Sequence, residues 1–483
     1  MKAVQSRHVE DIGDWYNGAT FRTPVEQGYF LSNTCIALSI STDGLQAWRH
    51  RGYEGWRIIA TIPNVDPSTR VQIVSQIVLG ITPGSRQPVD LASFLHPIAD
   101  ELNTLAAGVR GVSVVGCTEP QVVHAFVIQI TTDMPAGDKL INAIGGNGES
   151  PGRFRLFSGV WHMTRYYLPP YAPDDQPPSK HRCFAVMGRS TPQRTASIIA
   201  VGVKIVEDAR AAGKIKSAVR MIARHEGFTG YSLFFCPSPD DRKRDLAIRY
   251  MWEIGPDLAP YGTMHLFLSN VVPVLWGLCC GDKDKLGGDQ PWDIASAACE
   301  AVGREIKAGR PTVPLSQARS LWNINKNSSS FKAVDWMYSL LSIGAVVLAD
   351  RISEEIFRMF MLLCQAGRVL FKISAMTTDE QKDVDKHLRL FCSAFCTHVY
   401  AGKEERLRAC RPTVVALLDV AANLRSCGPA SSFWQCPAER LIGTLSRLIR
   451  SRRFPYAALT DAITSRCTTE LVTSYAEGHL SRA

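Results

Sequence analysis

The sequence predicts an α/β protein in which a strand-rich first part is followed by a long helical region. Residues 28–135 contain segments rich in Ile and Val, each ended by Pro, Gly or Asp, which is typical of strands. Residues 328–423 are mostly amphipathic, with apolar residues at helical spacing. The chain has 483 residues, of which 46% are hydrophobic, so it can bury large cores in two or three domains.

The strand-like segments and the first helix follow one another closely. The pattern predicts strands at residues 28–42, 56–65, 70–84 and 122–133, with a helix at 90–109 before the last of them. A strand that is reached through a helical crossover enters its sheet in parallel. We therefore expect residues 122–133 to run parallel to an earlier strand of the same sheet.

The later part of the chain is predicted to be helical. A stretch rich in Pro and charge, residues 170–196, indicates an irregular connection and a domain boundary. Beyond it, residues 197–225 and 286–309 have apolar residues at helical spacing, as does the long stretch at 328–423.

The charge of the chain is positive and uneven. Lys and Arg total 54 against 45 Asp and Glu, a formal net charge of +9. The excess gathers at residues 214–224, 242–244 and 440–453. Basic patches favour a polyanionic partner such as nucleic acid or a membrane surface, and solvated surface is the alternative.

The sequence lacks the signals of secretion and of membrane insertion. The N-terminal residues 1–15 carry charges of both signs and no apolar core of a signal peptide. The longest uncharged apolar stretch, residues 336–349, is shorter than the ~20 residues that a membrane-spanning helix needs. We expect an intracellular protein with no transmembrane segment.

Two of the predicted strands end in an aspartate on comparable faces. Because successive side chains of a strand alternate, Asp43 shares a small, polar face with Ser41, and Asp133 shares the less apolar face with Thr131. If the strands are neighbours, the two carboxylates meet, and converging carboxylates are what a pair of Mg²⁺ ions requires in phosphoryl transfer. The alternative is that each acid is an ordinary turn residue, as the sequences STDG and TDMP allow.

A third acid is found near the C-terminal end, on a predicted amphipathic helix. Pro437 suits the first turn, and apolar residues recur at helical spacing from Leu441 to Ile449. Arg440, Arg447 and Arg450 group on the opposite side, with Glu439 between the basic and the apolar sides. Glu439 could face a cleft while the arginines approach phosphates; the alternative is an acid favoured by the helix dipole, with solvated arginines beyond it.

Several short motifs in the same order resemble a known family. They are STDG, TDMPAGDKL, RYYLPP, GFTGYSLFF, PYGTMHLFLSNVVPVLW and GPASSFWQCPAERLIGTL, at residues 41–44, 132–140, 165–170, 227–235, 260–276 and 428–445. Together they resemble a transposase of the CACTA (En/Spm-like) group, in the diverged form abundant in fungal genomes. The resemblance covers most of residues 35–460.

The resemblance implies an RNase H-like catalytic core that is interrupted by a long α-helical insertion before the final catalytic helix. It implies a DDE-type enzyme that cleaves DNA phosphodiester bonds and transfers strands. Asp43, Asp133 and Glu439 would be the catalytic acids and would bind two Mg²⁺ or Mn²⁺ ions, with His265 as a supporting residue. DNA would be the partner, in the nucleus, and self-association of the chain is a further expectation.

The residues implied to contact DNA lie on and after the last catalytic helix. They are Arg440, Arg447, Arg450, Arg452 and Arg453. Such contacts to the phosphate backbone give an affinity that depends on salt and little on sequence.

The chain also departs from the family pattern. Gly146, Gly152 and Arg155 stand where the family commonly has a His and two Cys, so any metal or structural role of that set is lost. Gly262 replaces the acid of the Asp-x-Met-His segment, while His265 remains. This combination is typical of a decaying or repurposed copy. The N-terminal region has no recognisable finger or helix-turn-helix for binding element ends.

The resulting division of the chain has five parts. They are an N-terminal extension, the first part of the RNase H-like core, an irregular connection with a helical middle region, the helical insertion, and the catalytic helix with its tail, at residues 1–30, 31–170, 171–310, 311–425 and 426–483.

Two functions remain open at this point. The first is a metal-dependent, transposase-type nuclease and strand-transferase with reduced activity. The second is a non-catalytic DNA-binding or protein-interaction protein on the same scaffold. An unrelated helical scaffold would require Asp43, Asp133 and Glu439 to lie far apart.

Overall fold

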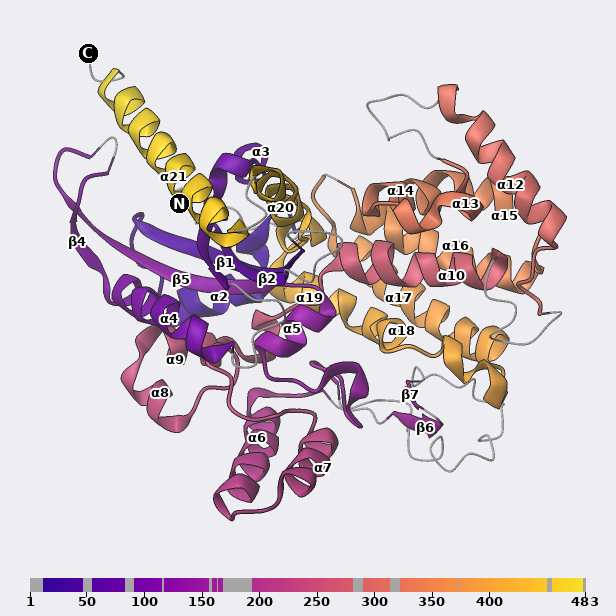
Figure 1. Ribbon diagram of the computed structural model, residues 1–483, viewed down its shortest axis with the longest axis horizontal. Coiled ribbons are helices and arrows are strands. Elements are labelled where there is room, and N and C mark those ends of the chain that lie inside the picture. The colour runs from indigo at the N-terminus through magenta and orange to yellow at the C-terminus, as the bar shows by residue number, and fades with distance from the viewer. Residues whose placement is uncertain are drawn as a thin grey trace.

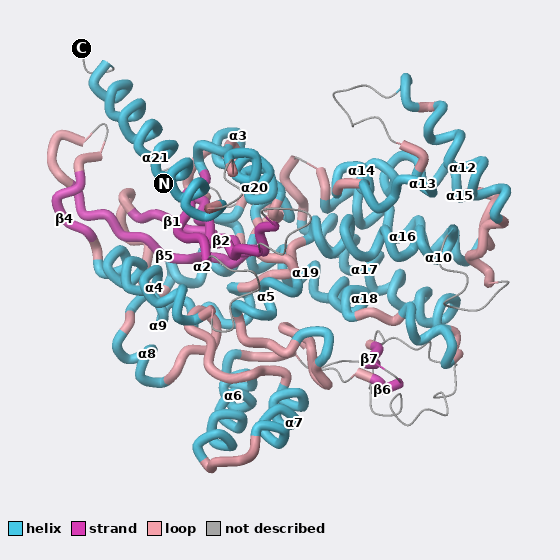
Figure 2. The backbone as a smooth tube through the Cα atoms, viewed as in Figure 1, coloured by secondary structure: helices cyan, strands magenta, loops and turns pink. Residues whose placement is uncertain are grey.

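The protein is seen here in a computed structural model that describes most of the chain. The described residues are 12–46, 54–82, 91–114, 117–155, 159–162, 164–167, 193–280, 290–312, 322–372, 374–449 and 454–480. They form a sheet lobe, made of the large sheet and the helices on its two faces, and a helical lobe, made of the helices between Met264 and Cys427. Figure 1 shows the two lobes side by side, and in Figure 2 the long strands gather in one of them.

Within the described residues, the long strands form one mixed sheet in the order β3-β2-β1-β5-β4. The pairs β1–β2, β2–β3 and β4–β5 are antiparallel, and β1 and β5 are parallel. The bounds are β1 Cys35–Gln46, β2 Glu54–Thr61, β3 Gln76–Thr82, β4 Val109–Val112 and β5 Gln121–Thr131. The predicted α/β class and the parallel entry of the last strand are confirmed. β4 was not predicted, because four residues are too few to show a pattern.

One face of the sheet packs against three helices. α2 (Ala19–Glu26), α4 (Ala92–Ala107) and α9 (Leu246–Ile254) share an apolar core with β1 and β5. α4 is the helix predicted at residues 90–109, and it buries Leu95 and Leu102 on its inner side. The central strands β1 and β5 are thereby largely buried on this face.

The opposite face is covered by the C-terminal helices. α20 (Cys436–Leu448) has Pro437 in its first turn, as predicted, and packs Leu441 and Leu445 against Ile59 of β2. α21 (Pro455–Leu480) follows and extends away from the sheet to the C-terminal end (Figure 1). Because Arg57, Ile59 and their cross-strand partners share one side of the sheet, α20 lies on the face that carries Asp43.

The helical lobe has one continuous apolar core, which runs from Tyr261 to Phe433 and also includes Phe154. It is built from a π-helix at Met264–Val271 and from α10 Val272–Cys280, α12 Ser296–Ala308, α13 Ile324–Asn327, α14 Ala333–Tyr338, α15 Gly344–Leu348, α16 Glu354–Leu370, α17 Thr378–Ala394, α18 Pro412–Ala416 and α19 Val420–Cys427. The helical character predicted for residues 286–309 and 328–423 is confirmed.

Several further elements complete the described chain. They are α3 Pro67–Arg70, α5 Met134–Leu140, α6 Ala196–Ala211, α7 Lys216–Glu226, α8 Pro239–Arg244 and a small hairpin of β6 Val160–His162 and β7 Thr164–Tyr166. α6 and α7 are the helices predicted at residues 197–225. Most of the predicted irregular connection, residues 168–192, lies outside the described residues. In the ranges that the structure describes, every helix is too short or too polar to cross a membrane.

Candidate active site

β1 and β5 bring two predicted acids to the same end of the sheet. The strands are parallel neighbours, and Ser41 pairs with Thr131. Asp43 lies two residues beyond Ser41, and Asp133 lies two residues beyond Thr131, so the two acids occupy equivalent places along the pair. The sequence analysis expected the two carboxylates to meet if their strands were neighbours in one sheet, and the strands are neighbours.

A bulge in the β1–β5 ladder sets this register. The pairing shifts between Leu38 and Ser39, where β5 carries one extra residue. A slip of one residue changes which side chains stand opposite each other. Without the bulge, Asp43 would stand opposite Thr132 and not opposite Asp133.

Asp133 ends its strand and begins the next helix. It is the N-cap of α5, and its Oδ1 accepts a hydrogen bond of 2.7 Å from the backbone N–H of Ala136. The other acid of the same motif, Asp138, pairs with Nε of Arg153 at 3.1 Å. Of the two acids in TDMPAGD, Asp133 therefore lies at the site, as predicted, and Asp138 is a structural partner of Arg153.

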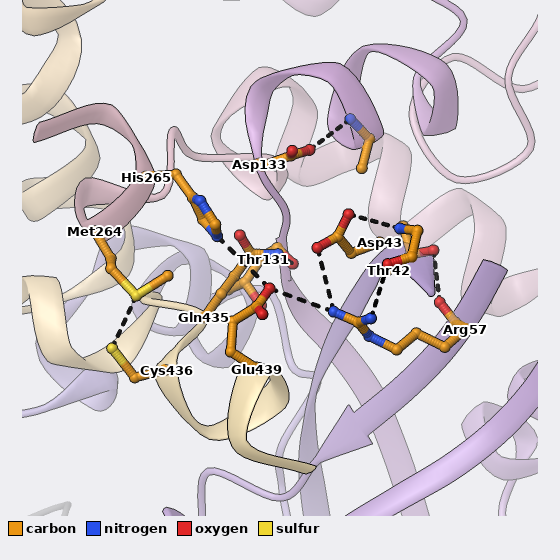
Figure 3. A network of polar contacts seen from close by, with 12 residues as sticks. Thr42, Asp43, Arg57, Thr131, Asp133, Met264, His265, Gln435, Cys436 and Glu439 are labelled. Carbon is orange, nitrogen blue, oxygen red and sulfur yellow. Dashed lines mark hydrogen bonds and ion pairs between the residues drawn. The ribbon is translucent and has the colours of Figure 1, made fainter. Parts of the chain in front are cut away.

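Two glutamines fix the chain that leads into α20 onto β5. Gln129 Nε2 donates to the carbonyl oxygen of Ser432 at 2.6 Å, and Gln435 Nε2 donates to that of Thr131 at 3.3 Å. These bonds hold the first turn of α20 over the end of β5. Glu439 lies in that first turn, with 40% of its side chain exposed, and points toward the acids of the sheet (Figure 3).

His265 reaches the site from the start of the helical lobe. Tyr261 forms a parallel bridge with Thr132, which extends the sheet beside the end of β5. This bridge places the following residues next to the acids, and His265 Nε2 lies 3.9 Å from Oε1 of Glu439. The predicted supporting residue is thus in the cluster, as Figure 3 shows.

Arg57 lies at the centre of the cluster, and the sequence analysis missed it. It stands opposite Asp43 on β2. Its Nη2 donates to Asp43 Oδ2 at 3.2 Å and to Glu439 Oε1 at 3.4 Å, and its Nη1 donates to the carbonyl oxygen of Gly44 at 3.0 Å. Its side chain is only 2% exposed. A single charged residue inside the apolar run WRIIA was the available signal, because a buried charge needs a partner.

The electrostatics of the site follow from burial and from crowding of like charges. Burial raises the pKa of Asp43; Arg57 lowers that pKa and the nearby charge of Glu439 raises it. Burial also raises the pKa of Asp133, and the charge of Asp43 adds to this. Burial lowers the pKa of His265, against the pull of the Asp133 and Asp43 carboxylates. The acids interact across the site, so the cluster favours a cation among them.

The donor set fits a hard divalent cation in its chemistry. Asp43, Asp133 and Glu439 supply carboxylate oxygens, and His265 an imidazole nitrogen, from four separate segments. In the arrangement seen here, however, the guanidinium of Arg57 lies between Asp43 and Glu439. Across the described residues, no three His, Cys, Asp or Glu side chains are grouped as a metal site. A metal ion and Arg57 would therefore need the same two carboxylates.

The predicted DNA-contacting arginines are described in part. Arg440 and Arg447 are exposed on α20, opposite its buried leucines. Arg440 Nη1 also donates to the carbonyl oxygen of Val71 at 3.4 Å. The other three lie outside the described residues: Arg450, Arg452 and Arg453.

Arg155, one of the positions where the sequence differs from the pattern that it resembles, has a clear structural role. It forms an ion pair of 2.5 Å through its Nε with Asp419 Oδ1 in the helical lobe. Its Nη2 donates to the carbonyl oxygen of Leu418 at 3.0 Å. Gly152 is buried nearby, and the Gly146 carbonyl accepts a bond of 2.9 Å from the hydroxyl of Tyr167. These contacts hold the segment against the helical lobe and Tyr167.

The other departure, Gly262, adjoins the site. A Cβ atom at this position would lie 3.2 Å from the carbonyl oxygen of Thr132 and 3.8 Å from Oε1 of Gln435. The side chain of an acid at this position would therefore begin close to the start of α20, the helix that carries Glu439. Gly262 itself contributes no side chain to the edge of the cluster.

Comparisons with known proteins give no name to this arrangement. A scan against protein-family models finds no match, and a search of the curated proteins finds none either. The case for function therefore rests on the ordered motifs and on the geometry of the cluster.

Proposed function

We propose that this chain is a transposase-derived protein of the CACTA (En/Spm-like) type, with an RNase H-like core, that acts on DNA phosphodiester bonds as a DDE-type endonuclease and strand-transferase. The observation that carries the proposal is the convergence of Asp43, Asp133 and Glu439. These acids come from β1, the end of β5 and α20, which are far apart in the sequence. If these acids were ordinary turn residues or a solvated helix acid, their side chains would not be expected to lie together.

The topology supports the RNase H-like part of the proposal. Three consecutive antiparallel strands, β1 to β3, are followed by α4, by the short edge strand β4 and by β5, which lies parallel to β1. The long helical lobe then intervenes before α20 returns to the sheet. This order is the one expected of a core that is interrupted before its last catalytic helix.

The residues of the chain have distinct roles in the proposed reaction. Asp43, Asp133 and Glu439 would hold two divalent cations, and these supply activation of water or a DNA 3′-hydroxyl and stabilisation of the leaving oxygen. His265, whose Nε2 lies 3.9 Å from Oε1 of Glu439, would support the acids as a further polar group of the site. Arg440 on the exposed side of α20 holds the phosphate backbone that approaches the cluster.

A cleavage assay tests this function. The purified chain is incubated with Mn²⁺ and a supercoiled plasmid that carries the DNA flanking its own reading frame. Nicking and strand transfer are expected, with a loss of at least about 100-fold in Asp43→Asn. Asp66→Asn is the matched control, since Asp66 is an exposed cap of α3 away from the cluster. Equal activity in wild type and Asp43→Asn would contradict the assignment.

A second function is favoured by one observation, the position of Arg57 between Asp43 and Glu439. On this view the scaffold binds DNA or another protein without cleaving DNA. DNA binding that weakens steeply with salt and is unchanged in Asp43→Asn, together with no cleavage, is the expected result. Cleavage that requires Asp43 would exclude it.

The remaining parts of the proposal are the nucleus as the location and self-association of the chain. Both are motivated by the resemblance and by a DNA partner. Fluorescence of a tagged chain tests the first, and light scattering of the purified protein tests the second.

A further inference from the structure

Arg57 differs from an ordinary structural arginine in what it contacts. Its Nη2 serves two carboxylates that belong to different elements, Asp43 on β1 and Glu439 on α20. These acids are 22% and 40% exposed, whereas Arg57 is 2% exposed. The buried cation therefore contacts two acids that are more exposed than it is, and Figure 3 shows its guanidinium joined to both.

The contacts of Arg57 are loose for a charged pair. Charge-assisted N–H···O bonds have lengths of about 2.7–2.9 Å, and those of Arg57 Nη2 are 3.2 and 3.4 Å. Its Nε is buried and has no hydrogen-bond partner in the described structure. The guanidinium therefore lacks the short hydrogen bonds of a tight structural ion pair, and one of its own N–H groups has no acceptor.

Other polar atoms around the same point also lack partners. His265 Nε2 and Gln435 Oε1 are buried without a hydrogen bond within the part of the chain that is described. Both residues border Glu439 in Figure 3. Buried polar atoms without partners cost free energy, so a cluster of them beside three acids points to a ligand that would complete the site.

We propose that Arg57 is a tethered counter-cation that takes the place of a divalent metal ion between Asp43 and Glu439, and that it must leave before a metal ion can bind there. This inference rests on the proposed function in that both assign metal binding to the three acids. It adds that the site is closed in the absence of metal by a residue of the chain itself.

The distances show why both cations cannot be accommodated. A Mg²⁺ or Mn²⁺ ion binds carboxylate oxygens at about 2.0–2.2 Å. A metal ion between Asp43 and Glu439 would draw these acids together across the space that Nη2 fills. Binding of the metal therefore includes the breaking of both Arg57 contacts, which weakens the observed affinity by their free energy.

The test is Mn²⁺ binding, followed by the electron paramagnetic resonance signal of free Mn²⁺. Arg57→Met is expected to bind Mn²⁺ at least about tenfold more tightly than wild type. Arg57→Gln, which keeps a polar side chain, is measured beside it in case the methionine variant does not fold. Arg351→Met is the control, because it breaks another arginine–carboxylate pair, that with Glu305, in the helical lobe.

Thermal unfolding gives a second readout. Without metal, Arg57→Met leaves the acids without a cation, so its Tm should fall below that of wild type, and Mn²⁺ should raise it again. Adding Asp43→Asn to Arg57→Met should abolish the gain in Mn²⁺ affinity.

Two outcomes would overturn the inference and can be told apart. If wild type binds Mn²⁺ as tightly as Arg57→Met and Arg57→Gln, Arg57 does not compete with metal, and the three-acid site of the proposed function stands. If none of the three proteins binds Mn²⁺, the metal site itself is absent, and the proposed nuclease fails together with the inference.

Discussion

Two buried arginines hold carboxylates in different ways. Arg155 lies 2.5 Å from Asp419, which is 2% exposed, and the two form an isolated, close pair. Arg57 is shared at longer distances between Asp43 and Glu439. A close pair in a dry environment cannot change partners without a large loss of free energy, whereas a shared, looser one can. We therefore assign a structural role to Arg155, and we infer that Arg57 can exchange its carboxylate partners.

The pH dependence of stability tests the environment of Asp419. Burial raises the pKa of Asp419 from 3.8 to about 6, although Arg155 lowers it. The folded state then binds a proton between pH 3.8 and about 6 that the unfolded state has released, so this stabilising contribution is complete below pH 3.8 and is lost as the pH rises through about 6. Relative to Asp419→Asn, wild type should lose up to about 3 kcal/mol of unfolding free energy from pH 4 to pH 7. Urea titrations at each pH measure it, and a constant difference between the two proteins would be the contrary result.

At the residue scale, the sequence predicted the acids of the sheet better than their counter-ion. Alternation along β1 and β5 was enough to place Asp43 and Asp133 on comparable faces, because it is a local property of each strand. Arg57 meets Asp43 through the pairing of β1 with β2, and Glu439 through the docking of α20. Neither contact is encoded in a local pattern, so the sequence marks Arg57 as a charge inside an apolar run but does not give its partners.

At the scale of the element, Asp133 has two tasks that substitutions can separate. As the N-cap of α5 it accepts from the N–H of Ala136, and Asn caps a helix as well as Asp does. The unfolding free energy of Asp133→Asn should therefore lie within about 0.5 kcal/mol of the wild-type value, while that of Asp133→Ala should be lower by about 1 kcal/mol. Both should lose DNA cleavage. Urea unfolding midpoints and the plasmid assay measure the two effects.

The result that would argue against this separation is a common loss of stability in Asp133→Asn and Asp133→Ala. It would mean that the charge of Asp133, rather than its hydrogen bond, holds α5 in place. The same pair of substitutions at Asp66, which caps the four-residue α3 through the N–H of Ser68, provides the control.

The elements that the sequence predicted are the long ones with a sustained period. β5, α4 and α20 were expected near their observed bounds, whereas β1 begins seven residues later and ends four residues later than the predicted 28–42. The bulge at Leu38 and the bridge of Tyr261 to Thr132 were not, since each depends on one or two residues paired across the sheet. Yet these two details align Asp43 with Asp133 and bring His265 to them. The site is therefore less predictable than the fold that carries it.

At the scale of the whole molecule, the Arg155–Asp419 pair connects the segment that follows α5 to the helical lobe. Arg155→Met should lower the unfolding free energy by about 3–5 kcal/mol, because it leaves Asp419 buried without a partner. The double variant Arg155→Met/Asp419→Leu should recover most of that loss. A double-mutant cycle by urea unfolding measures the coupling, and additive losses would show that the pair does not join the lobes.

The structural parts of the chain do not follow the predicted boundary at residue 311. The predicted boundary at residue 311 separates a middle region from an insertion, but one apolar core includes helices on both sides of it, from α10 to α19. Composition hardly changes across this position, and the shared core arises only from packing. Helical periodicity predicts that these helices exist, but it does not predict which of them pack together in one core.

The contact between Arg57 and Glu439 joins residues that are 382 positions apart in the chain. At a synthesis rate of about 5–20 residues per second, Glu439 leaves the ribosome roughly 20–80 s after Arg57. Asp43 and Arg57 lie on adjacent strands and can pair soon after they emerge, so the nascent chain carries a neutralised half-site for most of its synthesis. The acidic centre is completed only when nearly the whole protein has been made.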